Sequence, residues 1–458
     1  CSLQRACLAT RFHPTSPAPL PATLPHVTVQ LPLYNEASVA ARLIHAAAAL
    51  DWPADRLHIQ VLDDSTDETT QVVHALVTSY AQRGVRLEHV RRPSRNGFKA
   101  GALQHGLATA TGSLIAIFDA DFVPPRDFLR RLCGHFSDET VALVQARWDH
   151  LNAEHGLLTR VQSLMLDGHF AVEQAGRAAQ QMCFNFNGTA GVWRRTAIEQ
   201  AGGWRADTLT EDLDLSYRAQ LLGWRFVYDH NTTAPAELPT QMTAFKGQQH
   251  RWTKGSIQTA LHLLGALWRS PLTLRARLHA TAHLLGNLAY VLLLVTALLL
   301  PVASPSVHAL GWTRGWMLDS VLWLMGSGAL AAFYAVAARR CGRSPWRALL
   351  MVFPLMALGA GMALSNAKGL LGGLLGIRSD FVRTPKQGGN RRPRYVARVG
   401  LLPVAELLLA AWLAAGAWLH ALHGWYGTVP VQALFSAGVF WVALGSLRQL
   451  WMSTSSPM

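Results

Sequence analysis

The chain has 458 residues, half of them hydrophobic, and a formal net charge of +14. Up to about residue 260, apolar strands alternate with polar helices and turns, whereas the apolar runs beyond about residue 280 are long enough to cross a bilayer. The basic excess is not interleaved with aromatic residues, and cytoplasmic loops of a membrane protein account for it, so we expect no nucleic-acid partner. Five scattered cysteines with no C-x-x-C pair argue against a disulfide framework or a zinc site.

The first predicted strand covers residues 27–31 and follows a Pro-, Ala- and Thr-rich lead-in, residues 1–26, which we expect to be flexible. An Ala-rich helix follows this strand without a G-x-G-x-x-G motif, so a dinucleotide cofactor is not expected. The second strand, residues 57–62, ends in two adjacent carboxylates, Asp63 and Asp64, before residues that start a helix.

A third strand, residues 85–90, leads into a basic segment, and a fourth, residues 114–118, ends in Asp119 and Asp121 before two prolines. Because ligands of an open α/β sheet bind beyond the carboxyl ends of its strands, both aspartates are expected at a substrate site. Two hard oxygen ligands suit Mg²⁺ or Mn²⁺ bridging a diphosphate, although a carboxylate that caps the next helix gives the same pattern. A helix from Asp127 and a strand over residues 141–146 follow.

Residues 185–193 combine small residues with aromatic and amide side chains, after a helix predicted over residues 157–181. This composition suits the face and hydroxyls of a sugar ring, and a glycine-containing turn between strands is the alternative. The next helix runs to about Leu222 and opens with Thr210, Glu211 and Asp212. These acids fit either a helix cap or a catalytic carboxylate at the edge of a site. A strand over residues 225–229 follows.

The segment Gln-Gln-His-Arg-Trp, residues 248–252, precedes an amphipathic helix predicted over residues 255–278. Basic residues flank Leu, Ile and Trp in this helix. We therefore expect it to lie along a membrane interface.

Four motifs in this order, followed by membrane spans, resemble the processive family-2 glycosyltransferases, which include cellulose, hyaluronan and chitin synthases. The motifs are Asp63-Asp64, Asp119-x-Asp121, Thr210-Glu211-Asp212 and Gln248-x-x-Arg251-Trp252. The amino-acid sequence is most similar to the cellulose-synthase-like mannan and glucomannan synthases known from plants at residues 60–67, 96–103, 144–148 and 186–193. The resemblance implies an α/β GT-A (Rossmann-like) domain over residues 27–254, followed by an α-helical transmembrane region over residues 279–458.

The resemblance also implies a role for each matching residue. The donor nucleotide sugar would contact Glu36, Asp63, Asp64, Lys99, Asp119, Asp121, Gln248 and Arg251. The acceptor would contact Phe186, Asn187, Gly188, Thr189, Glu211 and Trp252. Asp119 and Asp121 would hold a divalent cation, Mg or Mn, and Asp212 would be the catalytic base. A carboxylate that deprotonates an acceptor hydroxyl during attack on the anomeric carbon gives inversion in one displacement, without a covalent intermediate.

Four spans are predicted, over residues 280–302, 316–338, 401–423 and 430–451. The apolar stretch 349–377 is broken by Pro354, several glycines and two polar residues. The catalytic domain is expected in the cytoplasm, where nucleotide sugars are found. Both flanks of the stretch 349–377 are basic and are therefore also expected on the cytoplasmic side. A segment with both ends on one side does not cross once, so we expect it to lie on the interface or to re-enter. Two tight spans are the alternative.

The basic loop 378–398 resembles the gating loop of cellulose synthases, which would place Thr384 and Lys386 on the donor, although Arg383 departs from that pattern. A cytoplasmic loop is expected to be basic in any case. Relatives usually have a span before the catalytic domain, so a truncated N-terminus is expected. Because the given sequence ends soon after the last predicted span, we do not expect regulation through the cyclic-dinucleotide-binding domain of bacterial cellulose synthases.

The sequence therefore predicts an inverting membrane glycosyltransferase that adds hexose from GDP-mannose or UDP-glucose to a growing β-1,4-linked polysaccharide and passes the polymer through its spans. A glycolipid synthase with a lipid acceptor is the alternative enzyme, and a non-catalytic export subunit is the alternative from another class. The expected setting is the bacterial inner membrane, in contact with membrane lipid. The predicted function is compatible with an export partner or with a homo-oligomer.

Overall fold

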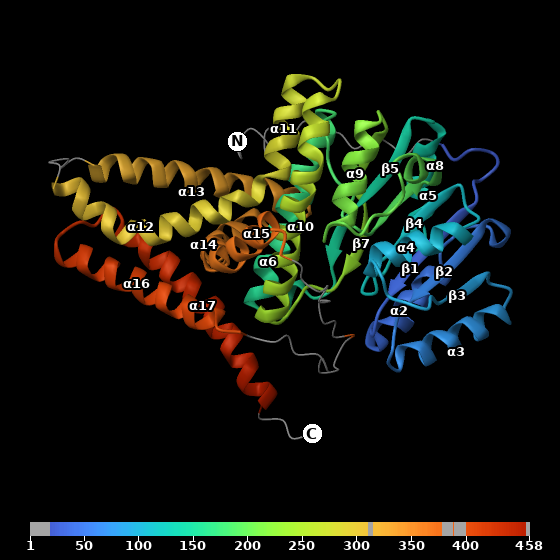
Figure 1. Cartoon of the computed structure of the whole chain (residues 1–458), viewed down its shortest axis with the longest axis horizontal. Helices are drawn as coiled ribbons and strands as arrows, with labels where there is room; N and C mark the ends of the chain where they lie inside the picture. Colours follow the sequence, from blue (N-terminus) through green and yellow to red (C-terminus); the bar gives the residue numbers. More distant parts are fainter. Residues whose placement is uncertain (1–18, 310–314, 378–387, 389–399, 455–458) are drawn as a thin grey trace.

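The computed structural model describes residues 19–309, 315–377, 388 and 400–454 (Figure 1). An α/β domain built on one sheet lies beside a group of long apolar helices, and the long helix α10 and the shorter helix α11 stand between them (Figure 1). The GT-A (Rossmann-like) fold class predicted from the sequence is confirmed.

The sheet has seven strands in the order β3-β2-β1-β4-β6-β5-β7. The strands are β1 Val27–Leu33, β2 Leu57–Asp63, β3 Leu87–Val90, β4 Leu114–Ile117, β5 Val141–His150, β6 Gly191–Arg194 and β7 Arg225–Ala236. Strands β1 to β4 pair in parallel, and β6 pairs antiparallel with both β4 and β5. All strands except β6 thus end at the same edge, which is where ligands of such sheets bind.

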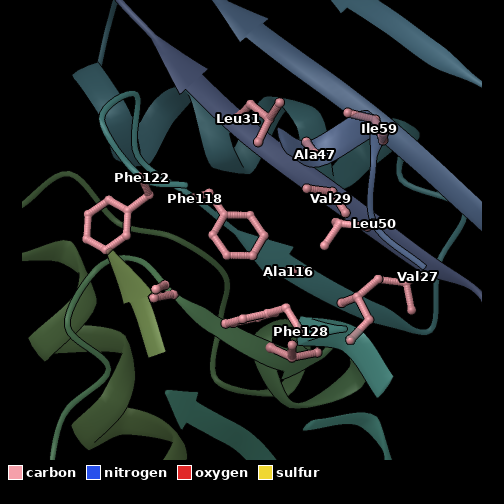
Figure 2. Close-up of a cluster of buried hydrophobic side chains, with 14 of the residues drawn as sticks. Val27, Val29, Leu31, Ala47, Leu50, Ile59, Ala116, Phe118, Phe122 and Phe128 are labelled. Carbon is pink, nitrogen blue, oxygen red and sulfur yellow. The ribbon is translucent and has the colours of Figure 1, made fainter. Parts of the chain in front are cut away.

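Alternating residues of β1 form part of the core. Val27, Val29 and Leu31 are fully buried and pack with Phe118 and Phe128, which follow β4 (Figure 2). The two phenylalanine rings lie edge to face, with centroids 4.9 Å apart. This packing fixes the end of β4, and therefore the position of the acidic residues that follow it.

Helices cover the sheet and continue into the second half of the chain. In the α/β domain they are α2 Ala37–Ala48, α3 Thr69–Ala81, α4 Phe98–Thr109, α5 Phe128–Cys133, α6 Leu157–Gly168, α7 Ala175–Ala179, α8 Arg195–Gln200 and α9 Glu211–Leu221. The remaining helices are α10 Met242–Arg269, α11 Leu274–Leu284, α12 Ala289–Ala309, α13 Gly315–Arg340, α14 Pro345–Gly361, α15 Ala363–Leu374, α16 Leu402–Leu422 and α17 Val429–Thr454.

Three helical segments among the described residues are long and apolar enough to cross a membrane: Gly286–Ala303, Leu402–Leu422 and Val429–Gln449. These segments match the predicted spans 280–302, 401–423 and 430–451. Helix α13 covers the remaining predicted span, residues 316–338. Helices α14 and α15 meet at a 45° bend, which fits a broken span or a re-entrant loop. The interfacial or re-entrant assignment of residues 349–377 stays a prediction.

The helix predicted over residues 255–278 has different bounds in the structure. Helix α10 begins at Met242, so residues 248–252 lie inside it rather than before it. It ends at Arg269, one residue before Ser270-Pro271, and Thr273 caps the separate helix α11 by accepting a hydrogen bond from the Ala276 backbone N–H. Proline cannot continue a helix from the preceding turn, which explains the break.

Candidate active site

A cavity of about 210 Å³ lies beyond the carboxyl ends of β1, β4 and β5 and is closed on one side by α10. Twelve of the residues assigned to a site from the sequence line it: Glu36, Asp64, Lys99, Asp119, Asp121, Asn187, Gly188, Glu211, Asp212, Gln248, Arg251 and Trp252. Residues from distant parts of the chain therefore converge here.

Lys99, in the first turn of α4, is the cation at the centre of the acidic residues. Its Nζ lies 2.6 Å from Asp119 Oδ1 and 3.9 Å from Glu211 Oε1, and donates a hydrogen bond to the Gly188 carbonyl at 2.8 Å. Burial would lower the pKa of Lys99, but the carboxylates of Asp119 and Glu211 outweigh it and hold this pKa above its usual value. Lys99 is therefore a fixed positive charge at this site.

Asp212 lies in the first turn of α9, next to Glu211. Burial, and secondly the neighbouring Glu211, raise the pKa of Asp212 to about 7, although Lys99 opposes the shift. Burial also raises the pKa of Glu211. A carboxyl whose pKa lies near neutrality is well suited to accept a proton from a substrate.

Gly188 approaches Asp212 so closely that a side chain would interfere. It has a φ of +77°, and a Cβ built on it would lie 3.0 Å from Asp212 Oδ2. Asn187, its neighbour, lines the cavity with its amide held by Gln174 and His169 at 3.0 and 2.9 Å. At Gly188, in the small-residue segment 185–193, the backbone itself therefore lines the cavity.

Asp119 and Asp121 are held at the cavity from different sides. The Asp119 backbone N–H donates to Thr189 Oγ1 at 2.9 Å, and Asp121 Oδ2 accepts from the Glu237 backbone N–H at 3.2 Å. Arg42 pairs with the Glu237 carboxylate at 2.7 Å and also donates to the Asp121 carbonyl. These contacts fix the loop after β4.

The two aspartates supply the hard oxygen donors that Mg²⁺ and Mn²⁺ prefer. Within the part of the chain that the structure describes, no group of three or more His, Cys, Asp or Glu residues could hold a metal ion. The donor set fits an ion whose other ligands come from a bound diphosphate and water, as Mg²⁺ sites commonly have.

Three of the predicted contact residues do not line the cavity. Phe186 is fully buried and packs against Trp193, with ring centroids 5.7 Å apart. Thr189 is fully buried and supports Asp119 instead of an acceptor. Asp63 is 1% exposed and accepts hydrogen bonds from the Ser65 backbone N–H and from His89, both at 2.9 Å. The structure places these three side chains beneath the cavity lining, and their direct contacts with substrate stay predictions.

Asp64 and several residues that the sequence reasoning missed form the end of the cavity next to β2. Asp64 accepts two hydrogen bonds from Arg92, at 2.7 and 2.6 Å. Arg95 lies 3.4 Å from the centroid of the Tyr34 ring, and both residues line the cavity. The basic cluster of residues 91–95 was the signal that could have identified them.

Replacing Asp63 by Asn tests its supporting role. The amide keeps the volume but has one acceptor oxygen in place of the two that bond Ser65 and His89, so we expect a loss of about 1–3 kcal/mol in the free energy of unfolding. Thermal denaturation of the purified protein measures this, and the donor KM should stay near that of the wild type. Asp64→Asn, which alters a cavity residue, should instead raise the donor KM. If Asp63→Asn raised the donor KM and left the stability unchanged, Asp63 would contact the donor and would not have a supporting role.

Helix α10 supplies Gln248, Arg251 and Trp252 to the cavity. Burial lowers the pKa of Arg251 to about 10, and the carboxylates of Glu211 and Asp119 oppose this shift. Arg251 therefore stays charged at neutral pH, next to the acidic residues. Thr384 and Lys386 lie outside the described residues.

The sheet order and the acidic residues beyond its strand ends define a GT-A glycosyltransferase. A solved mannosyltransferase, PcManGT from Pyrobaculum calidifontis in complex with GDP-Man and Mn²⁺, shares this fold with a TM-score of 0.54 at 22% identity, over 82% of this chain and 95% of that one. The family model "Glycosyltransferase like family 2" matches residues 25–255, and the chain belongs to this family. It is a hexosyltransferase with a region of apolar helices, as the sequence predicted.

Curated plant relatives match beyond the catalytic domain. The probable glucomannan 4-beta-mannosyltransferase 15 of Arabidopsis thaliana is 35% identical over 397 residues, which are 83% of this chain and 70% of the relative. Glucomannan 4-beta-mannosyltransferase 7 of the same plant is 33% identical over 92% of this chain and 76% of its own length. The probable glucomannan 4-beta-mannosyltransferase 11 is 47% identical, over 50% of this chain and 53% of its own length. The resemblance to mannan and glucomannan synthases is thus confirmed.

Proposed function

We propose that this protein is an inverting membrane glycosyltransferase that transfers mannose from GDP-mannose to the growing end of a β-1,4-linked polysaccharide. The observation that carries the proposal is one cavity that holds a carboxyl with a pKa near 7, Asp212, close to two fixed cations, Lys99 and Arg251. The names of the plant relatives support mannose as the sugar, and UDP-glucose is the alternative donor.

In this reaction Asp212 accepts the proton of the acceptor hydroxyl as its oxygen attacks the anomeric carbon. The bond to the diphosphate breaks at the same time, and Lys99 and Arg251 offset the charge that develops on the leaving group. Trp252 offers an aromatic face for the acceptor sugar. Asp119 and Asp121 would hold a divalent cation, Mg²⁺ or Mn²⁺, which when bound supplies further charge neutralisation at the diphosphate.

We place the apolar helices in a bacterial inner membrane, with the catalytic domain in the cytoplasm and lipid around the helices. Arg339 and Arg340 at the C-terminal end of α13, and Arg343 before α14, support this orientation, because basic loops stay on the cytoplasmic side. Passage of the polymer through these helices, with or without an export partner or a second copy, is part of the same proposal.

The pH dependence of transfer should report the titration of Asp212. The base acts only when ionised, so the transfer rate should rise with pH through about 7 and fall as the pH drops below that value. Initial rates at saturating donor measure this profile. Because Glu211 raises the pKa of Asp212, Glu211→Gln should move the midpoint to lower pH. A rate that does not change across neutrality would contradict the role of Asp212.

Removal of divalent cations with a chelator should abolish transfer, and Mn²⁺ or Mg²⁺ should restore it. In Asp121→Asn, which removes one of two anionic donors, we expect the metal concentration for half-maximal rate to rise about tenfold or more. Asp127→Asn is the matched control, because Asp127 is exposed and pairs with Arg131. Equal metal requirements in the two variants would contradict the assignment of Asp121.

Incubation of the purified protein with labelled GDP-mannose and, separately, with labelled UDP-glucose tests the choice of donor. We expect incorporation of mannose into an insoluble product. Incorporation of glucose alone would overturn the proposed donor and keep the reaction class. Incorporation from neither would overturn the proposed reaction.

A further inference from the structure

Helix α10 contacts the membrane helices along one face. Lys246, His250, Lys254 and Ile257 are spaced by three or four residues and therefore lie on the same side of the helix. His250 Nδ1 lies 3.5 Å from the Ser365 carbonyl, and a Cβ at Gly369 of α15 would lie 2.9 Å from that same nitrogen. The two helices thus meet at close backbone distance.

The strongest contact on this face is a buried ion pair. Lys246 Nζ lies 2.6 and 2.9 Å from the two carboxylate oxygens of Glu406 on α16, and donates to Ser446 Oγ on α17 at 3.3 Å. The side chain of Glu406 is fully buried, and that of Lys246 is 10% exposed. A buried ion pair has a desolvation cost. Loss of one partner is strongly destabilising, because it leaves the charge of the other partner buried without compensation.

The other sides of α10 carry and support the catalytic residues. Gln248, Arg251 and Trp252 line the cavity. A Cβ at Gly255 would lie 2.5 Å from Thr210 Cγ2, and Gln258 Oε1 accepts a hydrogen bond from the Leu209 backbone N–H at 3.1 Å. The loop that leads to Asp212 therefore rests directly on this helix.

We propose that Lys246 and Glu406 are positioning residues: their ion pair fixes α10, and with it Arg251, Trp252 and the Asp212 loop, on the membrane helices α16 and α17. The inference rests on the proposed transfer reaction. Because a displacement of about 1 Å can cost on the order of 100-fold in rate, the membrane helices would set the turnover of a cavity that, among the described residues, none of their side chains lines.

The test compares Lys246→Met, Glu406→Gln and the double variant Lys246→Met/Glu406→Met with the wild type. In each single variant we expect kcat to fall about 10- to 100-fold, and the affinity for the nucleoside monophosphate GMP, which lacks the second phosphate that faces Arg251 in the proposed reaction, to stay near wild type when measured by direct binding. The end of the cavity next to β2 is lined by Asp64, Tyr34 and Arg95, which lie on none of the helices that the pair joins. The double variant should lose no more kcat than either single variant, because two residues that act as one unit give non-additive effects.

Gln432→Met is the matched control. It removes a buried polar contact, Gln432 to His420 at 2.8 Å, between the same two membrane helices but at their other end. We expect lower thermal stability and an unchanged kcat. If the single variants do not fold, Glu406→Asp replaces them in the test. This variant keeps the negative charge on a shorter side chain, and we expect its kcat to fall below that of the wild type.

Three outcomes would overturn the inference: single variants, or Glu406→Asp where they do not fold, with a kcat near wild type; a kcat and a nucleoside monophosphate affinity that fall together; or a double variant whose loss in kcat is the product of the two single losses. A wild-type protein that transfers no sugar would instead overturn the proposed function. The two failures are therefore distinguishable.

Discussion

Asp212→Asn should reduce sugar transfer by about 100- to 10,000-fold, the range that a positioned general base contributes. The amide keeps the volume of the side chain and cannot accept the proton of the acceptor hydroxyl. Asp212 is partly buried beside Glu211 and Gly188, and the isosteric change should leave the fold and the affinity for the donor intact. Transfer rates and donor binding, measured on the same preparation, separate the two effects.

Asp207→Asn is the control for this variant, because Asp207 is an exposed carboxylate on the same loop, before the helix. We expect it to behave like the wild type. If Asp212→Asn kept wild-type transfer, Asp212 would not be the base. Glu211 would then be the next carboxyl to test.

Lys99→Met should lower kcat/KM by about 100- to 1,000-fold, as removal of a preorganised charge from a site commonly does. The variant loses the cation that faces the leaving diphosphate and leaves Asp119, Glu211 and Asp212 to repel one another. Because Lys99 lowers the pKa of Asp212, any residual activity should show its pH midpoint at a higher value than in the wild type. A pH series of initial rates measures both effects.

Two variants complete the Lys99 experiment. Lys99→Arg keeps the charge and should retain part of the activity, whereas Arg126→Gln makes the same change in net charge at an exposed residue of the loop after β4 and should have little effect. An unchanged pH midpoint in Lys99→Met would show that Lys99 is electrostatically remote from Asp212.

Much of the fold could be predicted because each strand ends in a recognisable change from apolar to acidic or basic residues. Strand β6, Gly191–Arg194, was not predicted as a strand, since four residues that begin with a glycine give little periodicity. Its antiparallel pairing with β4 and β5 depends on contacts distant in the sequence. Helix α10 was predicted to begin too late, because its cavity-lining residues interrupt the apolar pattern.

The site was predicted at the level of segments rather than of single side chains. Neighbouring residues of an extended chain point in opposite directions, so a motif of two adjacent residues places only one of them in the cavity. Asp64 lines it and Asp63 is buried, and Asn187 lines it where Phe186 enters the core. Glu406, the one acid in the predicted span 401–423, gave a signal that was not used, because an ionisable residue within a span commonly has a function.

The nature of the product tests the central proposal most directly. The purified protein, reconstituted in lipid, is incubated with GDP-mannose and a divalent cation, and the product is analysed for size, linkage and anomeric configuration. The proposed function predicts a polymer that organic solvent does not extract, made of β-1,4-linked mannose. A short, solvent-extractable glycolipid, or an α-linked product, would contradict it.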